Sequence, residues 1–468
     1  MLERLKQRIS GIFDTPIAPE NRGGVTQRHQ PRPFSKRSID AARGTRRQDS
    51  LGTFMQANGE IGNAVNLVRD RVRYLSLNDS YIRHGLNNWI AECVGNGLMP
   101  APLIEGTDRQ TIIRSWERFT RKADWRGGNF SGLQTNIVRA VRRDGEALCI
   151  FHHNDDEGLK IELIDVARID TQKTQNLANG IILNGVELDR QRRVTAIWIR
   201  PKVDDWLNLA GHDSIRFPAG SYLHVFEPEF AGQVRGISPL ASAVLNANDL
   251  AELHHAQRRA ALTASMLAAF VRNPNSGEPF EIDDDITFEP GAMLDVGNSE
   301  IQFSNPQNQG DAIDKFSKSH VRQLSAGLDV PTWLTDGDMS QVNYSSARSV
   351  LMPLRRKIEM FRENVLVPHF LNPVWERWAA LEMVNGRMNE GVEANWIAPA
   401  FYQVDPEKQT KSIVLMLKHK LISRESAIRM IHGSQSQTII QELEGEAELT
   451  GMDESDSYLR ILQGGSNG

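Results

Sequence analysis

Residues 327–352 read GLDVPTWLTDGDMSQVNYSSARSVLM, and this stretch decides how the rest of the chain is interpreted. A helical pattern ends at Val330 and Pro331, because proline cannot continue a helix. A second helix is expected to open at Ser345 and Ser346. The polar loop between them is too long for a tight turn. Such loops act either as lids over active sites or as contact surfaces, so the remaining sequence must show whether there is a site to cover.

The composition is that of an ordinary folded protein. The chain has 468 residues, 40% hydrophobic and 24% charged, enough for roughly two to four structural units. No apolar run approaches the roughly 20 residues of a transmembrane helix, and MLERLKQRISGIFDTP lacks the apolar segment of a secretory signal. Cys93 and Cys149 each stand among apolar neighbours without CxxC spacing. We therefore expect buried thiols in a reducing compartment, rather than a disulfide or a metal pair.

The net charge of −5 is unevenly distributed along the chain. Residues 1–47 carry 11 Lys or Arg against 4 Asp or Glu, whereas the C-terminal QELEGEAELTGMDESD is acidic. A protein that held DNA tightly over its whole surface would be basic overall, so any DNA contact should be transient or confined to the N-terminal arm.

Residues 1–50 are rich in Arg, Pro, Gly and Ser and are expected to form a basic, flexible arm. The arm is either a solvated tail or a segment that docks on a neighbouring subunit, on capsid or scaffold protein, or on DNA. Docking on a neighbour or on capsid is the favoured interpretation. The candidate docking residues are Arg28, Arg32, Lys36, Arg37, Arg43, Arg46 and Arg47.

Hydrophobic spacing predicts an α+β unit over about residues 50–230. A helix is expected from Gly62, and Asp79 can cap a second helix that ends at Gly95. Another helix should run over residues 133–143 and close at Gly145. The period then changes to that of strands, which are expected in ALCIFHH (147–153), KIELIDVARI (160–169), GIILNGVELD (180–189) and VTAIWIR (194–200).

Long helices are expected in the second half of the chain. Residues 236–272 hold no glycine or proline after Pro239, and Ser238 is a suitable N-cap, so one helix on the order of 50 Å is expected. After short β-like pieces, residues 311–328 should form a returning helix. Residues 345–381 should form another long helix, kinked at Pro368. A short helical module follows from Trp396.

No catalytic constellation stands out in the sequence. GxxxxGK[ST], a GxGxxG following a strand, and GxSxG are all missing. The pairs at His152 and His254 are adjacent histidines whose side chains point in different directions. Asp283, Asp284 and Asp285 offer oxygen ligands that suit Mg²⁺ or Ca²⁺, although a solvated acidic loop is the simpler interpretation. We therefore expect no enzyme activity, no bound metal and no cofactor, which leaves a lid nothing to cover.

Five separated stretches resemble, in order, the lambda-type family of phage portal proteins. They are LNDSYIRHGLNNWIAECVGNGLMP, FSGLQTNIVRAVRRDGEALCIFHH, HVFEPEFAGQVRGISPLASAV, LSAGLDVPTWLTDGDMSQVNYSSAR and WIAPAFYQVDPEKQTKS. The resemblance covers roughly residues 50–450. One mild departure is Gln409, where the family often has Glu. Another ring-forming head–tail connector, or a phage nuclease or protease, remains as an alternative.

The resemblance implies a ring of twelve subunits around an axial channel, with an α+β portal fold. Its regions would be a mixed wing, long stem and tunnel helices, a small clip and a helical crown. The implied boundaries are 1–50 for the arm, 51–235 for the wing, 236–272 and 311–330 for the stem helices, 273–310 for the clip, 331–344 for the tunnel loop, 345–395 for the tunnel helix and wing return, and 396–468 for the crown and acidic tail.

The resemblance also implies the partners. The ring would occupy one capsid vertex of the virion, after assembly in the host cytoplasm, and double-stranded DNA would be packaged and ejected through it. The clip, with Asp283, Asp284 and Asp285, would receive the terminase large subunit transiently and then the head–tail connector. Other copies of the chain, the major capsid protein and scaffold protein complete the implied partners, and no membrane is involved.

The charge of the loop fits such a channel. TDGDMSQVNYSS holds two Asp and no Lys or Arg, so twelve copies would place about two dozen carboxylates near the axis. Contacts between Lys or Arg and phosphates bind strongly, and a mildly acidic wall avoids them. We expect the loop to face DNA by polar and steric contact through Asp336, Asp338, Gln341, Asn343 and Tyr344.

Overall fold

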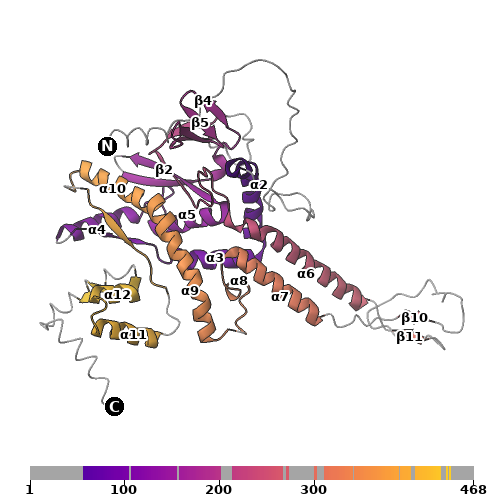
Figure 1. The fold of residues 1–468 in the computed structure, drawn as a ribbon. Coiled ribbons are helices and arrows are strands. Elements are labelled where there is room, and N and C mark those ends of the chain that lie inside the picture. The colour runs from indigo at the N-terminus through magenta and orange to yellow at the C-terminus, as the bar shows by residue number, and fades with distance from the viewer. Residues whose placement is uncertain are drawn as a thin grey trace, which may run out of the picture. The chain divides into compact units, whose positions relative to one another are not determined.

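The computed structural model describes residues 56–104, 107–154, 158–201, 213–266, 270–272, 300–302, 310–340, 342–388, 391–401, 406–433, 439–440 and 442–443 (Figure 1). The basic arm, Asp283, Asp284, Asp285, Gln341 and the acidic C-terminal stretch lie outside these residues. The mixture of helices and sheets confirms the predicted α+β class.

Three helices form one side of the core, and their ends follow the predicted signals. They are α2 (Ala57–Asn78), α3 (Ser80–Val94) and α5 (Phe130–Asp144). The Asp79 carboxylate accepts a hydrogen bond from Ile82 N at 2.9 Å, which caps α3. Gly145 follows α5 at φ 94°, a left-handed conformation that glycine adopts without strain.

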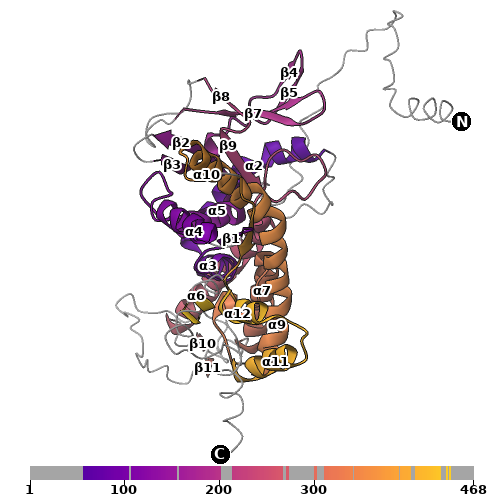
Figure 2. The ribbon, with the colours of Figure 1, turned by 90° about the vertical axis from the view of Figure 1, so that its left-hand side faces the viewer.

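Two antiparallel sheets follow α5 in the chain. The first has the order β3-β2-β9, built from β2 (Glu146–Asn154), β3 (Gly158–Ile164) and β9 (Tyr222–Phe226). The second is a five-stranded meander of β4 (Gln175–Leu177), β5 (Gly180–Leu183), β6 (Val186–Asp189), β7 (Val194–Ile199) and β8 (Ile215–Pro218). Side chains such as Leu148 and Ile197 form a small apolar core with members from both sheets, and the strands of the two sheets are seen in Figure 2. The strands predicted in ALCIFHH and VTAIWIR are confirmed. KIELIDVARI forms a strand only as far as Ile164, because residues 166–168 form a 3₁₀ turn, and GIILNGVELD forms two paired strands, β5 and β6.

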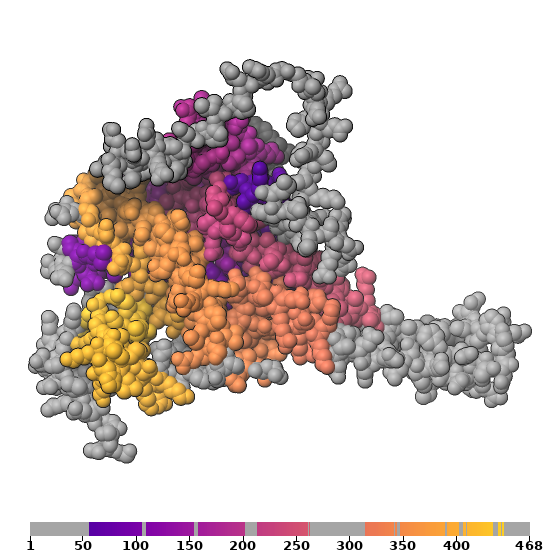
Figure 3. Space-filling model, in the orientation of Figure 1, coloured from indigo at the N-terminus to yellow at the C-terminus, as the bar shows by residue number. Residues whose placement is uncertain are grey.

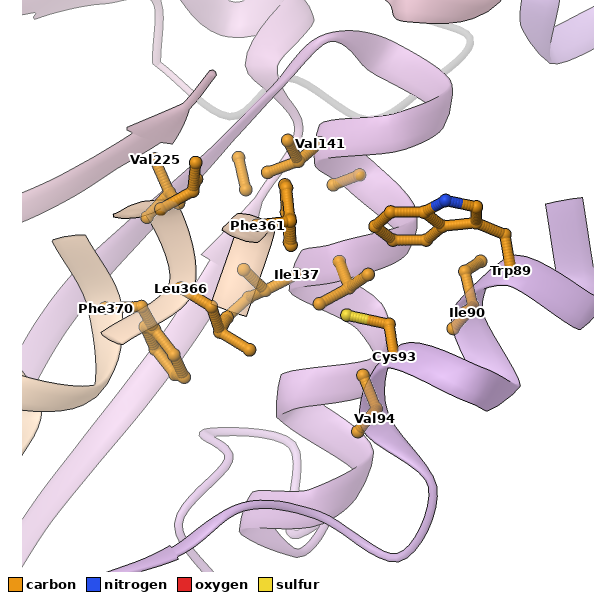
Figure 4. Packing of buried hydrophobic residues seen from close by; sticks show 14 of the residues in the cluster. Trp89, Ile90, Cys93, Val94, Ile137, Val141, Val225, Phe361, Leu366 and Phe370 are labelled. Atoms are coloured by element: carbon orange, nitrogen blue, oxygen red, sulfur yellow. The ribbon is translucent and has the colours of Figure 1, made fainter. Parts of the chain in front are cut away.

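The larger core joins the helices to the first sheet. Cys93 of α3 and Ile137 of α5 pack with Phe361 and Phe370, which come from a helical run much later in the chain (Figure 4). Cys93 and Cys149 are both buried free thiols, as predicted, and burial raises the pKa of Cys93 to about 12. Core packing thus links residues more than 200 positions apart in the sequence.

An aromatic cluster closes the core around Trp116. This side chain lies on α4 (Thr107–Thr120) and is almost fully buried. Its ring centroid is 5.0–5.9 Å from those of Phe119, Phe130, Trp375, Trp378 and Trp396. Trp396 belongs to β12 (Ala394–Ile397), which pairs antiparallel with β1 (Met99–Pro102). The cluster therefore fastens the returning chain onto its early helices.

The predicted long helix over residues 236–272 is shorter than expected. Ser238 caps a 3₁₀ turn, η3 (Pro239–Ser242), and α6 runs over Ala243–Met266. The prediction is wrong for β10 (Phe270–Arg272), a strand that pairs with β11 (Glu300–Gln302). Apolar β-branched and aromatic residues favour strands, and pairing across some 30 residues overrides the helical pattern here.

The returning helix is confirmed as α7 (Gly310–Leu328), which packs along α6 (Figure 1). Among the described side chains, none from Ala251 to the end of α6 is buried, and none of α7 before Val321. The two helices are therefore anchored in the core at one end only.

The next long helical run contains an irregular middle. It consists of α9 (Tyr344–Phe361), a π-helix η4 (Arg362–Leu371) and α10 (Asn372–Val384). Pro353 lies inside α9, and Pro368 lies inside the π-helix. The run changes direction between α9 and α10 (Figure 1). The predicted kink at Pro368 is thus taken up by π-helical geometry, a common site of helix bending.

Two short helices complete the described chain, α11 (Pro406–Lys418) and α12 (Arg424–His432). The Ser423 hydroxyl caps α12 by accepting from Ser426 N at 3.1 Å. Within the described residues, no helix combines the length and apolarity needed to cross a bilayer.

Candidate functional site

The segment between α7 and α9 contains a helical turn that the sequence did not predict. α8 (Trp333–Asp336) forms where a continuous loop was expected. Two contacts fix it against the core. The Ser325 hydroxyl donates to Thr335 Oγ1 at 2.9 Å inside the protein, and Asn88 Nδ2 donates to Leu334 O at 2.8 Å. These contacts hold the segment against the core from the end of α7 as far as Thr335, and the exposed residues begin at Asp336.

The two loop carboxylates shape the backbone that follows them. Asp336 Oδ1 accepts from Asp338 N, and Asp338 Oδ1 accepts from Ser340 N, both at 2.9 Å. These are consecutive Asx turns. The hydrogen bonds from Ser340 lower the pKa of Asp338, so its carboxylate stays ionised. Both side chains are exposed, as is Asn343.

The structure tests only part of the prediction for the other two loop residues, Gln341 and Tyr344. Tyr344 is the first residue of α9, and Gln341 lies outside the described residues. On α9 itself the exposed charges are mainly basic, because Arg348, Arg356 and Lys357 outnumber Glu359. α7 and α9 face the viewer together in Figure 3. The acidic character predicted for this region is therefore confined to the loop.

A fully buried ion pair lies where the first sheet meets the start of the α6 segment. The Glu146 carboxylate accepts from Arg235 Nε at 3.0 Å and from Gly236 N at 3.0 Å, with a further short contact to Arg235 Nη2. His224 Nε2 lies 2.8 Å from the same carboxylate. Burial alone would raise the pKa of Glu146, but Arg235 and His224 outweigh it and hold the pKa well below 4.5.

Two glycines allow this junction to close. A Cβ on Gly236 would lie 2.1 Å from Gly145 O, and a Cβ on Gly145 would lie 2.4 Å from Ile237 C. The DGE segment (144–146) and the RGISP segment (235–239) therefore pack backbone to backbone. The two segments belong to separate stretches of the sequence, yet they form one structural unit.

Arg142 connects this junction to the end of α7, which lies at the same anchored end of the α6–α7 pair. Its carbonyl accepts from the Ser238 hydroxyl at 2.8 Å, and its Nη2 donates to Leu328 O at 3.3 Å. The guanidinium is buried over the Trp89 ring, 4.2 Å from the centroid. Arg142 thus contacts both the start of the α6 segment and the end of α7.

Asp329 extends the same network to α9. It follows α7 in a left-handed conformation at φ 60°, which is uncommon for a non-glycine residue. Its carboxylate lies 3.6 Å from Arg142 Nη2 and accepts from Lys357 Nζ at 2.5 Å. Asp329 therefore links the C-terminal end of α7 to both α5 and α9.

Sequence reasoning missed the roles of Arg142, Glu146, Arg235 and Asp329. The available signal was a charged residue at the border of an apolar segment, such as Glu146 directly before ALCIF. Among the described residues, no group of three or more His, Cys, Asp or Glu is placed to hold a metal ion. The charged side chains gathered here are engaged in joining elements.

Comparison with known proteins finds the same family that the sequence stretches resemble. The model of phage portal proteins of the lambda family matches residues 43–362, more than half of the chain. The match stops before the WIAPAFYQVDPEKQTKS stretch. Among solved structures, a chain from the neck of an empty GTA (gene transfer agent) particle shares 13% identity at a TM-score of 0.47, covering 78% of this chain and 93% of that one.

A portal protein of the HK97 phage family from Corynebacterium diphtheriae shares 12% identity at a TM-score of 0.33, over 69% of this chain and 94% of that one. These two structural likenesses are weak, and the family match carries the assignment. It spans the core helices, both sheets, the α6–α7 pair, the loop and α9. The chain belongs to the lambda family of phage portal proteins.

Proposed function

We propose that twelve copies of this chain form a ring at one capsid vertex of the virion, around a channel through which double-stranded DNA is packaged and later ejected. Membership of the lambda portal family is the observation that carries this proposal. The family is structural rather than enzymatic, which removes the nuclease and protease alternatives. The half-anchored α6–α7 pair supports it, because side chains left unburied in one copy are available to neighbouring copies.

The ring is tested by measuring mass and shape. Twelve copies of a 52.6 kDa chain give about 630 kDa. We expect size-exclusion chromatography with light scattering to return this mass, and negative-stain images to show a central hole. A protein that remains monomeric at every concentration and salt tested would contradict the proposal.

We further propose that the 336–343 segment lines the channel and meets DNA by polar and steric contact. Its exposed carboxylates and the absence of Lys and Arg support this role. The basic side chains on α9 would lie beyond the 336–343 segment. Their contact with phosphate must be limited there, because DNA has to slide through the channel.

Replacing Asp336 and Asp338 together by lysine should block packaging. Each added lysine can form a phosphate contact, and each contact steepens the salt dependence of DNA binding by about 0.9 in log units. We expect isolated variant rings to retain DNA more tightly at low salt, and phage yield to fall at least about tenfold. The matched control is Asp336→Asn with Asp338→Asn, which keeps the Asx turns while removing the charge. Normal packaging by the lysine variant would show that the loop does not line the path of the DNA.

The clip and the arm lie outside the described residues, and their roles rest on the family and on charge. We propose that the clip, with Asp283, Asp284 and Asp285, receives the terminase large subunit during packaging and the head–tail connector afterwards. The basic arm would dock on neighbouring subunits or on capsid or scaffold protein. Deleting residues 1–45 should then impair ring or procapsid assembly, and unchanged assembly would contradict the role of the arm.

A further inference from the structure

Residues 227–232, between β9 and η3, form a continuous exposed segment. Its first four residues, Glu-Pro-Glu-Phe (227–230), are called the knob here. The buried Gln233 side chain braces it: Oε1 accepts from Glu229 N at 2.9 Å and from Phe230 N at 3.1 Å, and Nε2 donates to Arg235 O at 2.7 Å. The knob therefore presents two carboxylates and a 40% exposed aromatic ring from a fixed backbone.

The knob is also electrostatically suited to a cation. Burial, together with the nearby carboxylates of Glu229 and Asp329, raises the pKa of Glu227 despite the influence of Arg142. The carboxylates of Glu227, Glu229 and Asp329 thus lie near one another. A cation of a partner placed against the exposed Glu229 would be attracted to this group of carboxylates.

A groove of about 390 Å³ lies elsewhere on the protein, between α2, α5 and β3, and is called the socket. Three arginines line it. Arg73 and Arg143 both bind the Asp144 carboxylate, at 2.8 and 2.9 Å. Arg139 is different, because its described polar contact is Nη1 donating to the Asn87 amide oxygen at 2.7 Å.

Among the described residues, the charged groups that act on Arg139 are other cations. Burial lowers its pKa, and so do the neighbouring Arg143 and Arg83, with no carboxylate acting in the opposite sense. Two large apolar side chains near the end of α2 are exposed beside the groove: Tyr74 is 67% and Leu77 71% exposed. Within the part of the chain that the structure describes, the socket thus combines a cation that forms no ion pair with apolar surface, the complement of the knob.

The knob and the socket are attached to different parts of α2. The base of the knob is bonded to Asn58 at the start of α2, through Gly232 O at 2.9 Å and Val234 N at 3.0 Å. The socket uses Arg73 and Leu77 near the end of the same helix. At 1.5 Å per residue, Asn58 lies about 22–28 Å from Arg73 and Leu77 along α2. Two different but complementary surfaces on one chain suit a head-to-tail contact between copies, which generates rings.

We propose that the knob of one copy docks into the socket of the next, with Glu229 pairing with Arg139 and Phe230 covering Tyr74 and Leu77. This inference rests on the proposed ring and names the surfaces that build it. Opposite charges at such a contact select the correct neighbour, and like charges oppose association.

The test uses two full-length charge-reversal variants, Arg139→Glu and Glu229→Arg. Alone, each places like charges at every contact, so the ring fraction should fall at least about tenfold relative to wild type. Mixed in equal amounts they should co-assemble with alternating subunits, because each then offers the other an opposite charge. A ring with an even number of subunits can close in this way. The double variant Arg139→Glu with Glu229→Arg should form rings by itself.

Arg126→Glu, at an exposed arginine in the turn after α4, is the matched control and should assemble normally. Cooperative thermal unfolding of each variant, followed by circular dichroism, separates lost assembly from lost folding. If wild type forms rings and both single reversals do as well, the docking inference is overturned while the ring stands. The same holds if reversal rings form but no longer enter procapsids, since an external partner would then fill the socket. If wild type forms no ring, both proposals fail.

Discussion

Replacing Glu146 by glutamine is expected to destabilise the fold by about 3–5 kcal/mol, because the Arg235 guanidinium would remain buried without a counter-charge. Both side chains are fully buried. The glutamine keeps the shape of the carboxylate but also turns an amide donor toward the arginine. We expect urea unfolding, followed by circular dichroism, to show the first transition at clearly lower denaturant.

Two further variants separate this effect from general sensitivity. Glu425→Gln removes a carboxylate from an exposed pair with Arg429 and should change stability by less than about 0.5 kcal/mol. Glu146→Gln with Arg235→Met removes both charges and should be less destabilising than Glu146→Gln alone. Equal losses in the single and the double variant would contradict the account of an uncompensated cation.

The same pair predicts a pH dependence. The folded pKa of Glu146 is below its ordinary value of 4.5, so its stabilising contribution is fully present above about pH 4.5. The contribution is lost as the pH falls through the folded pKa. The difference in stability between wild type and Glu146→Gln should therefore be constant near neutral pH and shrink in acid.

Replacing Gly145 by alanine is the second change with a large expected effect, a loss of at least about 3 kcal/mol. Gly145 has φ 94°, and its added Cβ would lie 2.4 Å from the backbone carbon of Ile237. Backbone atoms cannot move aside as a side chain can. The turn that starts the α6 segment would have to shift away from β2, and the Glu146 contacts would be strained with it. The unfolding transition is again the measurement.

Gly220→Ala is the control matched in the φ angle. Gly220 has φ 90°, and a Cβ there meets nothing within 4 Å. Its replacement should cost only the conformational strain, about 1 kcal/mol. If the two alanine variants were equally stable, close packing at the junction would not be what constrains Gly145.

The sequence was sufficient for features that depend on nearby residues. The cap at Asp79, the glycine after α5 and the alternation in the β2 and β3 segments act over a few positions, and each gives the element it predicts. The family assignment also follows from local stretches read in order. These signals lie in the chain itself and need no knowledge of what packs against them.

The junction could not be predicted because it depends on contacts between distant segments. Glu146 and Arg235 are 89 positions apart, and either residue alone would pass for a surface charge. Phe270 appears helical by composition until β11 pairs with it. The turn at α8 likewise forms where Thr335 is hydrogen-bonded to Ser325 and Leu334 to Asn88. In each case tertiary contact determines the outcome.

The anchoring of α7 at one end has a mechanical consequence. With 19 residues the helix is about 28 Å long, and Asp329 clamps its end between Arg142 and Lys357. A rigid helix that is held at one end only moves most at its other end, so a tilt of 5° at Asp329 would displace the far tip by about 2.4 Å. The reverse also holds, because a force applied at the far tip turns the helix about Asp329. We therefore expect strain at the far end of the α6–α7 pair to reach α9 through the Asp329–Lys357 ion pair.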